Sequence, residues 1–205
     1  SSAEMEAVLN APDITTRIGI RDRAMLHVGF AAGLRVSELT GLLLSGVTLQ
    51  PTPTVCVMGK GRKQRALPLW KQAATDLRAW MAVRGEMATP ELFVNAQGQP
   101  LTRAGFSFVL KQHVLTATQQ CPSLKDKRVS PHVLRHTCAM VLFRATGDLR
   151  KVSLWLGHAQ MQTTEIYLRA DPMEKIEAIE GMTPLRLKRG RFSVPDQLIA
   201  SLQRK

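Results

Sequence analysis

The stretch that decides the fold is Ser130–Tyr167, which reads SPHVLRHTCAMVLFRATGDLRKVSLWLGHAQMQTTEIY. It contains an H-x-x-R pair, His132 and Arg135, and a Leu-Gly-His that ends at His158. Nine residues later comes Tyr167, the one tyrosine of the sequence. The question for the rest of the sequence is whether other residues form a site with this lone tyrosine and the histidines and arginine before it.

Ser130 followed by Pro131 is typical of a helix start, an N-cap residue with proline in the first turn. The apolar spacing predicts a helix to Gly147 that buries Val133, Leu134, Met140, Val141 and Leu142, and a second helix over 149–156. His132 and Arg135 then share one face near the helix N-terminus. Helix N-termini attract anions, so both side chains lie where a phosphate is favoured.

The composition indicates a polyanion as partner. Over 205 residues the formal net charge is +12, with 28 Lys plus Arg against 16 Asp plus Glu. A domain this basic is typical of nucleic-acid binders, the alternative being a merely soluble basic surface. The sequence shows no apolar run of the roughly 18 residues that a membrane span needs. It also lacks a secretion signal at its start, so we expect no membrane association.

The cysteines favour a reducing setting. Cys56, Cys121 and Cys138 show no C-x-x-C spacing, and three thiols cannot all pair. We therefore expect free thiols and a cytoplasmic protein, associated with the nucleoid if the partner is DNA.

Upstream of residue 130 the pattern predicts helices with a small hairpin between them. Helices are expected over 16–32, over 70–84 and from 102 onward, and short strands over 45–49 and 54–58, followed by a strand that includes 66–69. The predicted fold class is mainly α with a small antiparallel β-sheet or hairpin.

The predicted hairpin carries four cations within six residues, in the run GKGRKQR over 59–65. These residues are Lys60, Arg62, Lys63 and Arg65. At a hairpin tip they are expected outside the core, either as a solvated turn or as contacts to a phosphate backbone. Since the net charge already indicates nucleic acid, we favour DNA binding by Arg62, Lys63 and Arg65.

The run GLRVSEL over 33–39 places Arg35 and Glu38 three residues apart, so that on a helical turn they can pair. A surface ion pair of this kind is common and contributes little. The neighbouring Leu34, Val36 and Leu39 set this pair apart, because they are expected to half-bury the arginine.

Together these residues fit metal-free cleavage of a phosphodiester. Guanidinium groups form bidentate bonds to phosphate, and a cationic pocket lowers the pKa of a phenol from its usual value near 10. A mobile lysine can serve as the general acid. His132 and His136 alone do not make a zinc site, since no third ligand is placed beside them. A serine hydrolase is also unsupported, because the sequence has no G-x-S-x-G motif.

Five motifs resemble, in order, those of the tyrosine recombinases, also called the phage integrase family: GLRVSEL, GKGRKQRALPL, SPHVLRHT, LWLGH and TTEIY. The resemblance covers about residues 3–180 and implies the fold of a recombinase catalytic domain. It also implies the site roles: Arg35 and Arg135 bind the phosphate, Glu38 supports the site, Lys60 is the general acid, His132 belongs to the H-x-x-R pair, His158 bonds the phosphate, and Tyr167 is the nucleophile that forms a 3′-phosphotyrosyl link. Neither a metal nor another cofactor is implied, because the ester conserves the energy of the cut bond.

The resemblance implies a site-specific DNA recombinase or integrase that acts on double-stranded DNA and self-associates on it as a dimer or tetramer. We expect a catalytic domain over 1–182, without the N-terminal helical domain of many relatives. A basic connector and C-terminal helix follow over 183–205 and, by analogy, dock on a neighbouring subunit. Two alternatives stay open: a type IB topoisomerase-like relaxation of DNA, and a non-catalytic DNA-binding module.

Overall fold

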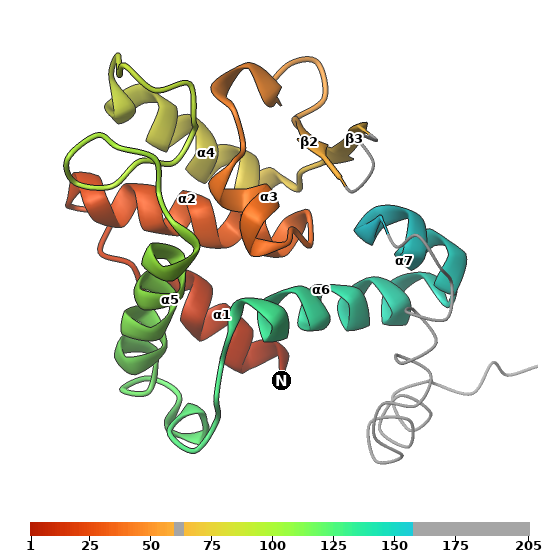
Figure 1. Cartoon of the computed structure of the whole chain (residues 1–205). Helices are drawn as coiled ribbons and strands as arrows, with labels where there is room; N and C mark the ends of the chain where they lie inside the picture. The colour runs from red at the N-terminus through yellow and green to blue at the C-terminus, as the bar shows by residue number, and fades with distance from the viewer. Residues whose placement is uncertain (60–63, 158–205) are drawn as a thin grey trace, which may run out of the picture. The chain divides into compact units, whose positions relative to one another are not determined.

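The computed structural model describes residues 1–59 and 64–157 (Figure 1). The predictions for Lys60, Arg62 and Lys63, and those for His158, Tyr167 and the rest of 158–205, concern residues outside these ranges. The described helices and strands are α1 (Ser2–Asn10), α2 (Arg17–Ala31), α3 (Val36–Thr40), β1 (Val47–Thr48), β2 (Thr54–Met58), β3 (Gln64–Pro68), α4 (Lys71–Arg84), α5 (Arg103–Ala117), α6 (Pro131–Thr146) and α7 (Leu149–Leu156). The predicted class, mainly helical with a small antiparallel sheet, is confirmed.

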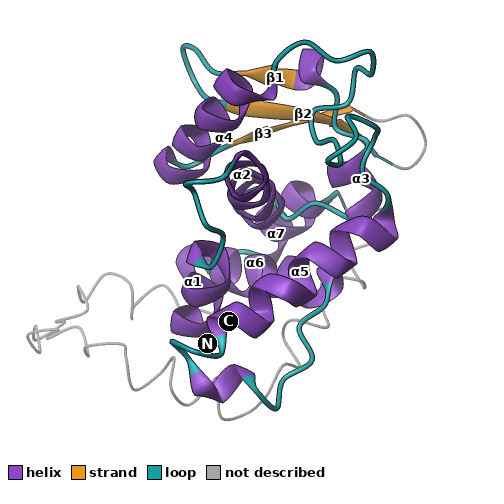
Figure 2. Cartoon of the chain, turned by 90° about the vertical axis from the view of Figure 1, so that its left-hand side faces the viewer, coloured by secondary structure: helices purple, strands orange, loops and turns teal. Residues whose placement is uncertain are grey.

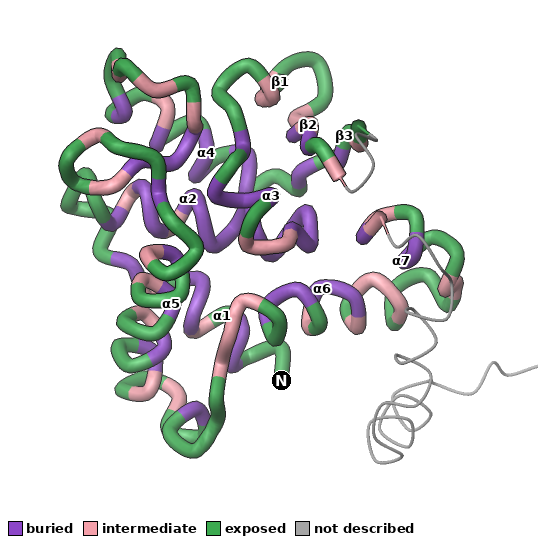
Figure 3. Tube along the Cα trace, viewed as in Figure 1, coloured by how far each residue is buried: buried purple, intermediate pink, exposed green. Residues whose placement is uncertain are grey.

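Helix α2 is the centre of this arrangement. It packs against α4 on the side of the sheet and against α1 and α6 on the other, as Figure 2 shows. Residues 24–31 of α2 are buried without a break, so this part of the helix is covered on all sides rather than along one stripe (Figure 3). A helix buried all round belongs in the middle of a fold. Helix α3 and the three strands, which lie between α2 and α4 in the sequence, are therefore attached to a buried helix.

The sheet is antiparallel, and within the described residues its strand order is β1-β2-β3. In the register Val57 lies opposite Arg65, and Val55 lies opposite Leu67. The prediction for β2 is confirmed, but the strand predicted over 45–49 is wrong in its first half. A 3₁₀ turn occupies Leu44–Gly46 instead. An added Cβ at Gly46 would lie 2.8 Å from the carbonyl oxygen of Cys56, so only glycine permits this close approach.

Helix α6 begins and ends as predicted. The Ser130 hydroxyl accepts the amide hydrogen of Val133, and Gly147 ends the helix in the left-handed region at φ 63°. The predicted buried face is partly wrong, because Val133 and Val141 are exposed. Arg135, Cys138 and Ala139 are buried beside Leu134 instead. Arg135 points inward, and Val133, two residues earlier, lies on the opposite side of the helix. Among the described helices, none is both long and apolar enough to cross a membrane.

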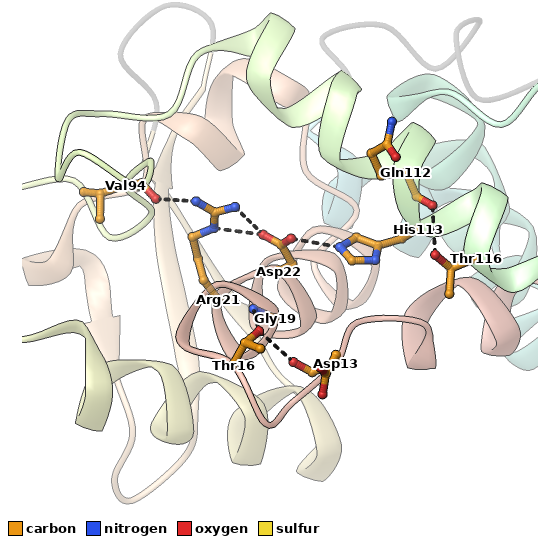
Figure 4. Close-up of polar contacts among 9 residues, drawn as sticks. All are labelled: Asp13, Thr16, Gly19, Arg21, Asp22, Val94, Gln112, His113 and Thr116. Atoms are coloured by element: carbon orange, nitrogen blue, oxygen red, sulfur yellow. Dashed lines mark hydrogen bonds and ion pairs between the residues drawn. The ribbon is translucent and has the colours of Figure 1, made fainter.

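A buried polar network ties α2 to α5 and to the loop that precedes α5 (Figure 4). The Arg21 guanidinium donates to the carboxylate of Asp22 at 2.6 and 2.8 Å and to the carbonyl oxygen of Val94 at 2.9 Å. The other Asp22 oxygen lies 2.8 Å from Nε2 of His113 on α5. Asp22 is therefore the anion that balances a buried arginine, and the sequence motifs gave no hint of it.

We predict that Asp22→Ala destabilises the fold by about 3 kcal/mol or more, because it leaves the Arg21 guanidinium buried without an anion. Chemical unfolding of both proteins measures the loss. Asp126→Ala is the matched control, since Asp126 lies exposed in the loop before α6, and it should change stability by about 0.5 kcal/mol at most. Equal stability of the two variants would show that the network contributes nothing.

Candidate active site

The site is built around the carboxylate of Glu38 on α3. One oxygen, Oε2, accepts the backbone N–H of Arg35 at 2.8 Å, which caps the short helix. The other, Oε1, accepts hydrogen bonds from Nη1 of Arg35 at 2.9 Å and from Nη2 of Arg65 at 3.1 Å. The Glu38 side chain is only 5% exposed. The predicted pair of Arg35 and Glu38 is therefore present, and it belongs to a buried cluster rather than to the surface.

Arg135 reaches the same carboxylate from α6. Its Nη1 lies 3.7 Å from Oε2 of Glu38 and donates to the carbonyl oxygen of Gly33 at 2.5 Å. Its Nη2 donates to the carbonyl oxygen of Leu156 at 2.7 Å. One guanidinium thus joins α6 to the turn after α2 and to the last turn of α7. These bonds fix the position of Arg135 in the fold.

The turn at Gly33 makes this approach possible. Gly33 has φ 58°, a conformation that favours glycine. A Cβ at this position would lie 2.6 Å from Cδ2 of Leu156 and 3.0 Å from Sγ of Cys138. The missing side chain lets α6 and α7 close on the turn, so that Arg35 and Arg135 come to the same carboxylate.

The cluster carries an excess of positive charge. Among the described residues, three guanidinium groups, those of Arg35, Arg65 and Arg135, meet the one carboxylate of Glu38, so these four side chains together carry a charge of +2. Buried charges usually occur in balanced pairs, because each unpaired charge costs solvation energy. An excess of two cations is therefore suited to holding an anion. Arg35 is the most exposed of the three, with 40% of its side chain accessible.

His132 lies one turn before Arg135 on α6 and is exposed to solvent. The structure thus brings together Arg35, Glu38 and Arg135 as predicted, with His132 near the start of the same helix. Lys60, His158 and Tyr167 lie outside the described residues. So do Arg62 and Lys63. Among the residues described, no three His, Cys, Asp or Glu side chains gather as metal ligands.

Arg65 departs from the position that the sequence predicts. The basic run predicts a solvent-exposed hairpin tip, but the Arg65 side chain is only 14% exposed and pairs with Glu38. The alternation of β3 contains the missed signal. Arg65 lies two residues before buried Leu67, and side chains two apart on a strand point to the same face. The basic run therefore ends with a residue that faces inward.

Cys138 lies beneath Arg135, one helical turn further along α6. Burial raises the pKa of its thiol to about 12, and the nearby Arg135 cation lowers it only in part. The thiol is therefore protonated at neutral pH and acts as a small apolar side chain against the turn at Gly33. It fills space under the site and supplies no nucleophile to it.

Known proteins are similar to this chain in sequence. The profile of the phage integrase family matches residues 1–174. The protein y4rC of Sinorhizobium fredii is 40% identical over 201 residues, which cover 97% of this chain and 60% of the relative. The tyrosine recombinase XerD of Pseudomonas putida is 41% identical over 172 residues, covering 82% of this chain and 55% of that protein. The chain thus spans little more than half the length of these relatives.

Solved structures of recombinases have a fold similar to that of this chain. The XerA recombinase aligns with a TM-score of 0.77 and 28% identity over 90% of this chain and 63% of that one. The XerH site-specific recombinase, in a post-cleavage complex with its palindromic difH substrate, aligns with a TM-score of 0.73 and 27% identity, covering 86% of this chain and 51% of that one. Sequence profile, relatives and fold agree, and the chain belongs to the phage integrase family.

Proposed function

We propose that this chain is the catalytic part of a site-specific DNA recombinase that cuts and rejoins strands through a covalent 3′-phosphotyrosine intermediate. The observation that carries the proposal is the Glu38 cluster, with three guanidiniums around one buried carboxylate. A phosphodiester carries one negative charge, and the pentacoordinate state during its cleavage carries two. A local excess of two positive charges matches that state better than the ground state, which is how electrostatic catalysis works.

The roles within the step follow from the family motifs. The phenol of Tyr167 gives its proton to a neutral histidine of the site while its oxygen attacks the phosphorus, and the bond between phosphorus and the 5′-oxygen breaks. Lys60 gives a proton to that oxygen, so the products are a free 5′-hydroxyl and a 3′-phosphotyrosyl ester. Arg35 and Arg135 hold the non-bridging oxygens, His158 bonds the same phosphate, and His132 is the histidine of the H-x-x-R pair. The reverse reaction with a 5′-hydroxyl of another strand rejoins the DNA, and the ester supplies the energy.

The proposed partners are double-stranded DNA and further copies of the chain. The relative XerH was solved bound to difH DNA, and the net charge of +12 favours a similar partner here. Exchange between two duplexes cuts four strands, and each copy carries a single tyrosine. Four copies are therefore needed for a complete exchange. A protein with this substrate acts at the nucleoid in the cytoplasm.

We predict that the chain becomes covalently attached to DNA through Tyr167. The test uses a library of randomised duplexes that carry a nick, since loss of the short freed strand prevents rejoining. Denaturing gels should show a protein–DNA adduct, and sequencing its DNA ends should return one preferred site. Tyr167→Phe should give no adduct, because it lacks the attacking oxygen. An equal adduct from Tyr167→Phe would exclude this nucleophile.

The same assay separates the two alternatives. Adducts at every sequence, together with relaxation of any supercoiled plasmid, would indicate a topoisomerase-like activity. DNA binding without an adduct under any condition would indicate a non-catalytic DNA-binding module.

We also predict different outcomes for lysine at the two phosphate-binding arginines. Arg35→Lys should slow cleavage about 10²- to 10³-fold, a typical cost of losing one charge-stabilising donor, with little change in the unfolding midpoint because Arg35 is partly exposed. Arg135→Lys should slow cleavage and also lower the midpoint, since one amine cannot replace the bonds to Gly33 and Leu156. Single-turnover cleavage and urea unfolding measure the two effects. Equal midpoints for both variants would contradict the different roles.

A further inference from the structure

Arg65 is the least expected member of the Glu38 cluster. It comes from β3, and its Nη2 donates to the same carboxylate oxygen as Nη1 of Arg35. Its side chain is 14% exposed, whereas that of Arg35 is 40% exposed. Arg65 is therefore the more buried of the two guanidinium groups that bond this oxygen.

The guanidinium of Arg65 also lies against the turn that ends α7. A Cβ built on Gly157 would lie 1.7 Å from Nη1 of Arg65 and 2.5 Å from its Cζ, so the two groups are in close contact. Gly157 has φ 64°, which ends the helix in the left-handed region. The next residue in the sequence is His158. Arg65 thus touches the backbone from which the Leu-Gly-His motif continues.

This placement is not explained by stability alone. Within the described part of the chain, Nε and Nη1 of Arg65 are buried and have no hydrogen-bond partner. A buried donor without a partner costs free energy, so each such group needs an explanation, and a role in an active site is one of them. A methionine of similar length would fill the space without this cost.

We propose that Arg65 is a positioning residue of the active site, an inference that rests on the proposed recombinase function. Arg65 and Arg35 both donate a hydrogen bond to Oε1 of Glu38. The Arg35 side chain therefore bonds the carboxylate through one nitrogen and keeps its remaining donors for the phosphate. Through its contact with Gly157, Arg65 also fixes the position of the backbone to which His158, the next residue, is attached. Arg65 therefore acts through Glu38, Arg35 and the Gly157 turn, and does not itself touch the DNA.

The test compares Arg65→Met, Arg65→Lys and the control Arg78→Met. Arg78 is exposed on α4, so its variant removes an equal charge outside the site. Cleavage is measured in single turnover on the DNA site recovered from the adducts, and affinity is measured on the same duplex. Arg65→Met should slow cleavage about 10- to 100-fold, as expected for misplaced reacting groups, with affinity within about threefold of wild type. Arg65→Lys should recover part of the rate, because its amine can still bond Glu38.

A double-variant cycle asks whether Arg65 acts through Glu38. Glu38→Gln and Arg65→Met are combined, and the double variant should cleave no more slowly than the slower single variant. Multiplied losses, or a rate for Arg65→Met equal to that of Arg78→Met, would overturn the proposal. So would a loss that appears only in affinity, because Arg65 would then be a DNA contact.

The wild type, Glu38→Gln, Arg65→Met and the double variant are also unfolded in urea. This measurement keeps the inference testable if the proposed function fails. Absence of any adduct from the wild-type chain would refute the recombinase function, and with it the positioning role in cleavage. The midpoint losses then still report the contact: a loss in the double variant smaller than the sum of the single losses supports the coupling of Arg65 to Glu38. Additive losses would overturn the coupling whether or not the chain cuts DNA.

Discussion

The site depends on one interaction, the sharing of the Glu38 carboxylate among three guanidiniums, which come from the residue before α3, from β3 and from α6. Like charges brought this close repel each other, and the single anion at their centre offsets part of that repulsion. The positive charge that these four side chains carry together suits the phosphate binding that we propose for the site. Glu38 thus has two effects at once: it holds distant segments together, and it leaves them with a net positive charge.

The backbone around the cluster is adapted to this task. Gly33 and Gly157, both in the left-handed region, let two turns approach side chains more closely than a Cβ would permit. Arg135 bonds the carbonyl oxygens beside these turns rather than carboxylates alone. Cys138 stays protonated beneath them because of its burial. The site is therefore set by backbone positions as much as by charge.

Much of this was predictable from the sequence, and the exceptions have physical causes. The caps at Ser130 and Gly147 and the pairing of Arg35 with Glu38 are local, so short-range rules found them. The inward turn of Arg65 was missed because the basic run around it suggested solvent. The Asp22 network was missed because its partner His113 lies 91 residues away. Long-range contacts between common residue types leave no motif in the sequence.

A crystal structure of the chain with tungstate, a phosphate-like dianion, tests whether the Glu38 cluster holds a phosphate. We expect one tungstate within hydrogen-bonding distance of Arg35 and Arg135, with Glu38 still accepting a hydrogen bond from Arg65. A tungstate bound elsewhere, with the cluster empty at saturating concentration, would contradict it. So would a Glu38 carboxylate turned away from the three arginines into solvent.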